Sequence, residues 1–301
     1  SQALPTDNLT QLANKLSDIK TRRVDLNELL ENSTQLIDHS AIDATKIRQL
    51  IHYVLQLNEL LYKLSTGSYG LGRSRYSLCI SSTSISRWAG SFPHNPFHVP
   101  VNIDITGEGA QIASGLVQGQ INDLLSAISL ERKSRASVES TSKKNTKLDL
   151  LQWSDLTLAE QQLCPPLLLV GGDEILAGQG LAQISLLLNS SYPIKIVIFS
   201  ELDSGLVASA HIDSANDLAL MAMSQRHAYV AQTSIADNSH LQQCVHEMLN
   251  FNATALLRIY TPSPSKHGFK PKLCLSQASL AIKTRMSPLF RYNPLLDGVF
   301  G

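Results

Sequence analysis

The chain has 301 residues, enough for one large α/β domain with an attached helical segment, or for two domains. Basic and acidic residues number 25 each, so the formal net charge is zero and no global field favours nucleic acid or an anionic membrane as a partner. Charged residues make up 17% of the chain, below the roughly 25% of an average soluble protein. We therefore expect part of the surface to be covered, by a partner, by a second copy in a homo-oligomer, or by the rest of a longer polypeptide.

Targeting signals and a disulfide framework are not expected. No apolar run, Leu167 to Val170 included, approaches the roughly 18 residues of a membrane-spanning helix, and the polar N-terminus lacks the form of a signal peptide. These features predict a cytoplasmic protein. The cysteines lie far apart without a CxxC pair, which predicts buried free thiols rather than a zinc knuckle or disulfides. They are Cys79, Cys164, Cys244 and Cys274.

The N-terminal part of the chain is predicted to be a helical arm, residues 1–65. Residues 7–65 contain neither proline nor glycine and repeat apolar residues at helical spacing. The glycines of residues 67–72 then predict a turn. The rest, residues 66–301, is expected to form one α/β domain. Within it, residues 131–147 carry almost no apolar side chain and are interpreted as a mobile loop or linker.

From Tyr76 onward, short apolar runs alternate with stretches of helical periodicity. The predicted strands are 78–80, 167–170, 194–199, 228–231 and 255–260, and the predicted helices are 180–188, 217–223 and 239–249. This alternation is typical of a parallel sheet with helices on both faces.

One predicted strand ends in a sequence suited to binding an anion. Leu167–Val170 is followed by Gly171, Gly172, Asp173 and Glu174 before a predicted helix. Ligands of parallel sheets bind at the carboxyl ends of strands, where helix N-termini offer free N–H groups to phosphates. An aspartate there is suited to hold a divalent ion. These residues alone are compatible with a cofactor site and with a plain strand-to-helix turn.

Several segments, in order along the chain, are similar to signature segments of one enzyme family. They are Trp88–Phe97 (WGGS-P--PY in the family), Gly171–Gly180 (GGDG…IG), Asp217–Met223 with Tyr229–Ser234 (DLGMMAM…YVAQVS), Tyr260–Gly268 (YSPC…HG) and Pro288–Pro294 (WPLYRYNP). On these segments, residues 66–294 resemble the thiamine-diphosphate-binding domain of the pyruvate:ferredoxin oxidoreductase family. The resemblance implies that domain's α/β fold, with thiamine diphosphate and magnesium as cofactors bound at residues 171–174 and Asp173 as a metal ligand. It also implies a pyrimidine-binding domain, on the same polypeptide or a sister subunit, as a partner.

The chain departs from the family at the residues that matter most for the cofactors. Glu174 replaces a motif glycine, and a carboxylate beside a diphosphate is repulsive. Leu206 falls near the family's second magnesium ligand, an asparagine, which leaves Asp203 as the stand-in. Ser84 and Ser263 fall at cluster cysteines, and serine is a poor ligand for iron, so we expect no iron-sulfur cluster.

Two functions follow from the resemblance and its departures. One is a degenerate module with a structural or docking role in a larger redox enzyme, such as a sulfite reductase-type subunit. The alternative is a divergent thiamine diphosphate-dependent domain for oxidative decarboxylation of a 2-oxoacid. Two weaker alternatives remain, another anion at the same helix N-terminus and a zinc site at His240 and Cys244, which are four residues apart.

Overall fold

The computed structural model describes residues 44–81, 89–90, 97–99, 101–138, 150–173, 176, 180–201 and 217–296. The chain divides into two compact units. The first comprises residues 1–73 and 121–163, and the second comprises residues 74–120 and 164–301. The first boundary lies a few residues beyond the predicted division at 65/66. A second chain segment joins the helical unit, which sequence periodicity did not predict.

The described part of the first unit is helical. Helix α3 (Ala44–Ser65) ends where the glycine turn was expected, and Gly67 adopts a positive φ of 61°. The other elements are the second half of α5 (Gly109–Val138), the 3₁₀ turn η2 (Trp153–Asp155) and α6 (Leu158–Gln161). Arg132 on α5 holds Glu160 on α6 through two contacts of 2.8 Å.

The predicted loop over residues 131–147 begins too early. Residues 131–138 form the last two turns of α5, and residues 139–147 lie outside the described residues. Glu131 and Arg135 pair one helical turn apart, which stabilises a helix that has few apolar residues. Polar composition was therefore mistaken for irregular structure.

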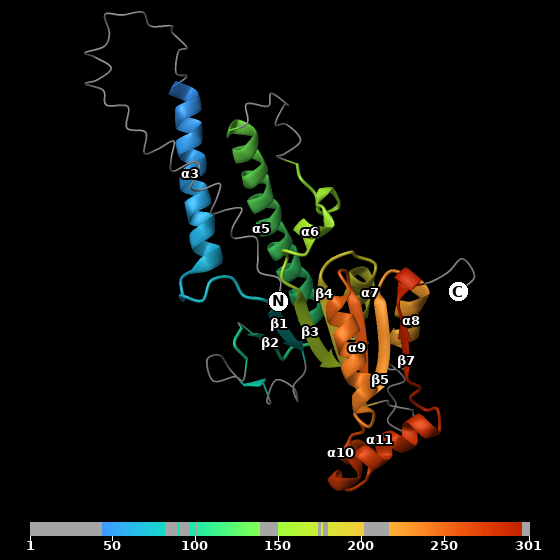
Figure 1. Cartoon of the computed structure of the whole chain (residues 1–301). Helices are drawn as coiled ribbons and strands as arrows, with labels where there is room; N and C mark the ends of the chain where they lie inside the picture. The colour runs from blue at the N-terminus through green and yellow to red at the C-terminus, as the bar shows by residue number, and fades with distance from the viewer. Residues whose placement is uncertain are drawn as a thin grey trace, which may run out of the picture. The chain divides into compact units, whose positions relative to one another are not determined.

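The second unit is built around a sheet that, in the described residues, has seven strands in the order β2-β1-β3-β4-β6-β5-β7 (Figure 1). The strands are β1 (Ser77–Ser81), β2 (Val101–Asp104), β3 (Leu167–Gly172), β4 (Ile194–Ser200), β5 (Tyr229–Ser234), β6 (Ala255–Tyr260) and β7 (Phe290–Tyr292). All neighbours pair in parallel except β5 and β7, which are antiparallel. The predicted α/β class with a mainly parallel sheet is confirmed.

Helices of this unit lie on both faces of the sheet. They are the first half of α5, α7 (Leu181–Leu188), α8 (Leu218–Gln225), α9 (Asn238–Asn250), α10 (Pro264–His267) and α11 (Cys274–Lys283), with 3₁₀ turns η5 (Pro271–Leu273) and η6 (Pro294–Leu296). Alternate residues of a strand point to opposite faces. Tyr229 and Leu257 belong to the cluster that contains Cys244 and Met248 of α9, whereas Arg258 contacts Asp217 at the start of α8. We call these the α9 face and the α8 face.

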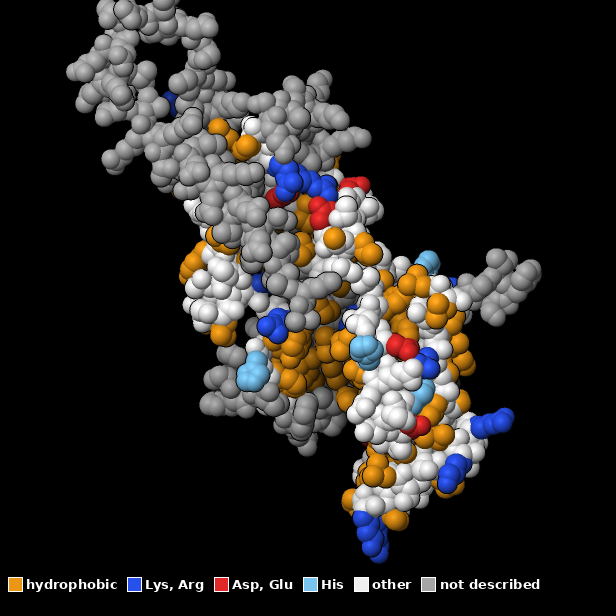
Figure 2. All heavy atoms as spheres, in the orientation of Figure 1, with side chains coloured by type: hydrophobic (Ala, Val, Ile, Leu, Met, Phe, Trp, Pro, Cys, Tyr) orange, Lys and Arg blue, Asp and Glu red, His pale blue; other side chains and the backbone are white. Residues whose placement is uncertain are grey.

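The α9 face carries two apolar clusters. Beneath α9, β4, β5 and β6 contribute one continuous core. Toward the β2 edge of the sheet, Leu78 and Ile80 of β1 pack with Val99, and the partly buried Leu168 and Val170 of β3 border them. Figure 2 shows hydrophobic side chains in the region of β1 and β3, where Leu168 and Val170 are partly buried and Leu78 and Ile80 are buried.

None of the helices in the described ranges has both the length and the apolar character needed to cross a membrane.

Candidate functional site

Polar side chains meet at the carboxyl edge of the parallel strands. Asp173 follows β3, Ser200 ends β4, and Thr261 follows β6. Asp217 is the N-cap residue of α8. Because parallel strands all end at this edge, it is the place where ligands bind in proteins of this architecture. Asp173 lies at the carboxyl end of a strand, where the sequence placed it, and its predicted role in binding a cofactor and a metal stays a prediction.

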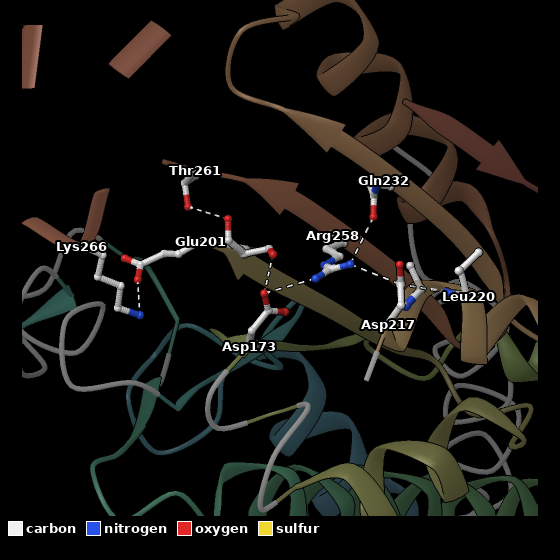
Figure 3. Close-up of polar contacts among 10 residues, drawn as sticks. Asp173, Glu201, Asp217, Leu220, Gln232, Arg258, Thr261 and Lys266 are labelled. Atoms are coloured by element: carbon white, nitrogen blue, oxygen red, sulfur yellow. Dashed lines mark hydrogen bonds and ion pairs between the residues drawn. The ribbon is translucent and has the colours of Figure 1, made fainter. Parts of the chain in front are cut away.

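The centre of the cluster is Arg258, from the middle of β6. Its side chain is only 9% exposed and lies between two carboxylates, as Figure 3 shows. Nη2 is 3.4 Å from Oδ2 of Asp173, and Nη1 is 3.1 Å from Oδ1 of Asp217. Nη1 also faces Oε1 of Gln232 at 3.4 Å. A buried guanidinium requires such acceptors, because an unpaired charge in the interior is strongly destabilising.

Each acceptor around Arg258 is itself held in place. Ser200 donates its hydroxyl hydrogen to Oδ2 of Asp173. Asp217 accepts the backbone N–H groups of residues 219 and 220 at 3.0 and 3.1 Å, so its carboxylate caps α8 while it pairs with the arginine. Gln232 donates from Nε2 to the carbonyl oxygen of Pro288 at 2.9 Å, which directs its own Oε1 toward Arg258. The cluster thus links β3, β4, β5, β6 and α8.

A second ion pair lies nearby at the same edge. Glu201, directly after β4, pairs with Lys266 of α10, and both side chains are more exposed than Arg258. Figure 3 places this pair on the other side of Asp173 from Asp217. Exposed pairs of this kind contribute little to stability. The edge therefore holds one cluster centred on a buried arginine, whose partner Asp217 is 42% exposed, and one solvated pair.

The residues predicted to bind a cofactor are described only in part. Gly171 and Gly172 end β3, and Asp173 follows them. Glu174 and Asp203 lie outside the described residues, so their predicted roles stay predictions. A Cβ atom added to Gly171 would come within 2.8 Å of the Leu176 side chain and of a β1 carbonyl oxygen. The absence of a side chain at Gly171 is thus required by close packing with Leu176 and β1.

The described residues fit a bound magnesium diphosphate poorly. Magnesium needs near-octahedral oxygen ligands, usually including one or two carboxylates. Oδ2 of Asp173 already faces Arg258 and Ser200, which leaves only Oδ1, a buried atom without a hydrogen-bond partner among the described residues. A guanidinium beside a divalent cation is also repulsive. The geometry serves as an ionic cross-link, and no reaction step follows from it.

Sequence reasoning missed Arg258, although a signal was present. The strand Ala255–Tyr260 was predicted, and it contains one charged residue in an otherwise buried apolar run. Arginine is almost never fully buried without a partner, so an arginine within a buried strand predicts acidic partners elsewhere in the chain. Asp173 and Asp217 are far from it in sequence, 85 and 41 residues away, and only the parallel topology brings the three together.

The zinc alternative on α9 gains no support from the contacts there. His240 Nδ1 lies 3.0 Å from Thr233 Oγ1 and 3.4 Å from Cys244 Sγ. Burial raises the pKa of the Cys244 thiol to about 11, which disfavours the thiolate that a metal needs. Glu247 is engaged by Tyr229 and Arg291. In the part of the chain that is described, no three His, Cys, Asp or Glu side chains gather as a metal site.

The fold and this edge define an α/β domain with a mainly parallel sheet and an ionic cluster around buried Arg258 at the carboxyl edge of its strands. No family model matches the chain. Over 90 residues, 30% of the chain, it is 32% identical to pyruvate:ferredoxin oxidoreductase from Moorella thermoacetica, of which those residues are 8%.

A solved structure of 2-oxoglutarate:ferredoxin oxidoreductase from Magnetococcus marinus overlaps 70% of this chain and 60% of its own, with a TM-score of 0.41 and 13% identity. The chain thus spans less than two thirds of either relative. The sequence similarity to the Moorella enzyme supports a domain related to the 2-oxoacid:ferredoxin oxidoreductases.

Proposed function

We propose that this chain is a thiamine-domain-like module of a 2-oxoacid oxidoreductase-related protein that has lost cofactor turnover and serves in assembly. The observation that carries the proposal is the pairing of Asp173 with buried Arg258. The one described residue that the family resemblance assigns to magnesium is engaged by a cation of the chain itself. A carboxylate held in this way is poorly placed to ligate a second cation.

Other features support an assembly role. On the α9 face, Leu168 and Val170 of β3 are only partly buried (Figure 2), and the whole chain has a low charge content of 17%. Both are expected of a module that is covered by other parts of a larger protein. Suitable parents are a redox enzyme with a pyrimidine-binding sister domain, or a sulfite reductase-type subunit. Ser263 at a cluster-cysteine position is in keeping with a module that has no iron-sulfur cluster.

The alternative, a divergent thiamine diphosphate-dependent domain, is favoured by one observation. Oδ1 of Asp173 is buried and lacks a partner among the described residues, at the edge where ligands of parallel sheets bind. In that case the thiamine ring would supply the electron sink for decarboxylation, and this chain would contribute only the diphosphate half of the site.

Calorimetric titration with thiamine diphosphate and magnesium separates the two functions. We expect no saturable heat up to millimolar cofactor, with the intact chain and with Asp173→Ala alike. Both proteins are first checked by circular dichroism to be folded. Saturation at micromolar cofactor that disappears in Asp173→Ala would mean a working half-site, and the assembly proposal would then be abandoned.

A further inference from the structure

We propose that the Arg258 guanidinium is a built-in counter-ion that occupies the site between Asp173 and Asp217 and keeps divalent cations out. This inference rests on the proposed function, because it explains how an edge that resembles a cofactor site is stable without one. It goes further in naming one residue as the determinant of cation exclusion. The starting observation is the poor fit of Asp173 to a metal ion.

The contacts of Arg258 are those of a cation in a prepared site. Its guanidinium is 3.4 Å from Asp173 and 3.1 Å from Asp217, with its side chain 9% exposed. Gln232 adds a third oxygen at 3.4 Å, and the hydrogen bond from Gln232 to Pro288 fixes which of its amide atoms faces the guanidinium. Three oxygen atoms from three different elements therefore point at one positive group. A guanidinium carries several N–H donors in one plane, so this one side chain can meet all three acceptors.

The charge balance explains why the arginine must be displaced before a metal enters. Two carboxylates and one guanidinium leave a net charge of −1 in the cluster. A divalent ion placed beside Asp173 would meet the positive charge of Arg258 in a region with little water to screen it. Without the guanidinium, the same two carboxylates and the Gln232 oxygen would form a set of oxygen ligands with a charge of −2, which attracts divalent cations.

The two possible states of the site predict opposite signs for a change in stability. If Arg258 is the counter-ion, neutralising Asp173 leaves a buried guanidinium short of an acceptor, and the protein is destabilised. If the site were instead an empty metal site, neutralising one of its carboxylates would remove repulsion between like charges and raise stability. The variant Asp173→Asn keeps the size of the side chain and an oxygen for the Ser200 hydroxyl, so it isolates the charge.

The first experiment measures thermal unfolding in a chelator-containing buffer. We expect Asp173→Asn to lower Tm by at least about 4 °C, the shift that loss of a buried pair gives in a domain of this size. The matched control is Glu201→Gln, which removes a neighbouring but exposed ion pair and should change Tm by less than about 2 °C. An unchanged or raised Tm for Asp173→Asn overturns the proposal.

The second experiment titrates Mn²⁺ alone and follows binding by electron paramagnetic resonance. The unaltered protein should show no saturable site up to millimolar Mn²⁺. Arg258→Met should gain one site per chain, at least tenfold tighter than any residual binding, and Arg258→Met combined with Asp173→Asn should lose it. Arg132→Met, which removes the arginine from its ion pair with Glu160, should gain no Mn²⁺ site.

A folded Arg258→Met protein that gains no Mn²⁺ site refutes the proposal, as does unaltered protein whose Mn²⁺ site vanishes in Asp173→Asn. If Arg258→Met does not fold, Arg258→Gln repeats the titration, and the sign of the Asp173→Asn shift decides independently. The two proposals fail separately. Binding of thiamine diphosphate without metal would refute the assembly function but not the role of Arg258 as counter-ion. An Arg258→Met protein that binds no Mn²⁺ would refute the counter-ion role but not the assembly function.

Discussion

A buried lysine near the amino end of β4 allows a direct test of how tightly this part of the sheet is packed. Lys195 on β4 is 2% exposed, and its ammonium group donates to the carbonyl oxygens of Phe251 and Ala253, 5.8 Å from the centre of the Phe251 ring. Burial lowers the pKa of this ammonium from its ordinary 10.5 to about 8. The perturbation is Lys195→Met, which keeps the length of the side chain and removes the titrating group.

The direction in which stability changes with pH depends on whether the folded or the unfolded state binds the proton more tightly. Between pH 8 and 10.5 the unfolded chain keeps Lys195 protonated while the folded protein has begun to release the proton, so stability rises with pH. The displacement of the pKa corresponds to about 3 kcal/mol over this range. Burial raises the pKa of the Cys79 thiol to about 12, so the folded protein keeps a proton that the unfolded chain releases above pH 9. This second group therefore lowers the stability of the protein as the pH rises above 9. The difference between the unaltered protein and the variant cancels that shared effect.

Urea unfolding at a series of pH values from 7 to 10.5 measures this difference. The stability of the unaltered protein relative to Lys195→Met should rise by about 3 kcal/mol across the range. Lys272→Met, at an exposed lysine, should give a curve parallel to that of the unaltered protein. If the curve of Lys195→Met is also parallel to that of the unaltered protein, to within about 1 kcal/mol, burial does not lower the pKa of the Lys195 ammonium.

Two further predictions concern glycine packing and thiol reactivity. Gly109→Ala should lower the free energy of unfolding in urea by about 2 kcal/mol or more, because a Cβ atom there would lie 2.2 Å from the Ser81 side chain. Gly115 is on the same helix but has open space around it, so Gly115→Ala should raise the free energy of unfolding by about 0.5 to 1 kcal/mol. Equal effects would contradict the close contact. With iodoacetamide at pH 8, mass spectrometry should find the partly exposed Cys274 labelled well before buried Cys79, whose thiol pKa is raised to about 12; the reverse order would contradict this burial.

Much of the fold could be predicted from local sequence patterns. The buried strands β3, β4 and β6 are continuous apolar runs, and their predicted bounds differ from those observed by two residues or fewer. Two strands at the sheet edges were missed. β2 is only four residues long with a single buried residue, and β7 is three residues long and pairs antiparallel with β5. Short edge strands have too few buried residues to produce a periodic signal.

The location of the site could be predicted, but its chemistry could not. The rule that ligands bind at carboxyl ends of parallel strands placed Asp173 correctly at that edge. Its partner Arg258 comes from the middle of a strand that is distant in sequence, and no pattern of spacing connects the two. A buried ion pair is a property of the tertiary fold, so the sequence alone left the cofactor interpretation open.

We expect Arg258, and no metal ion, to neutralise the Asp173 carboxylate. The most direct test is a crystal structure of protein soaked with Mn²⁺ and thiamine diphosphate, with data collected near the manganese absorption edge. We expect the guanidinium to lie between Asp173 and Asp217, with no anomalous peak within coordination distance of either carboxylate. An anomalous peak at Asp173, with Arg258 turned away and diphosphate density beside Gly172, would contradict it.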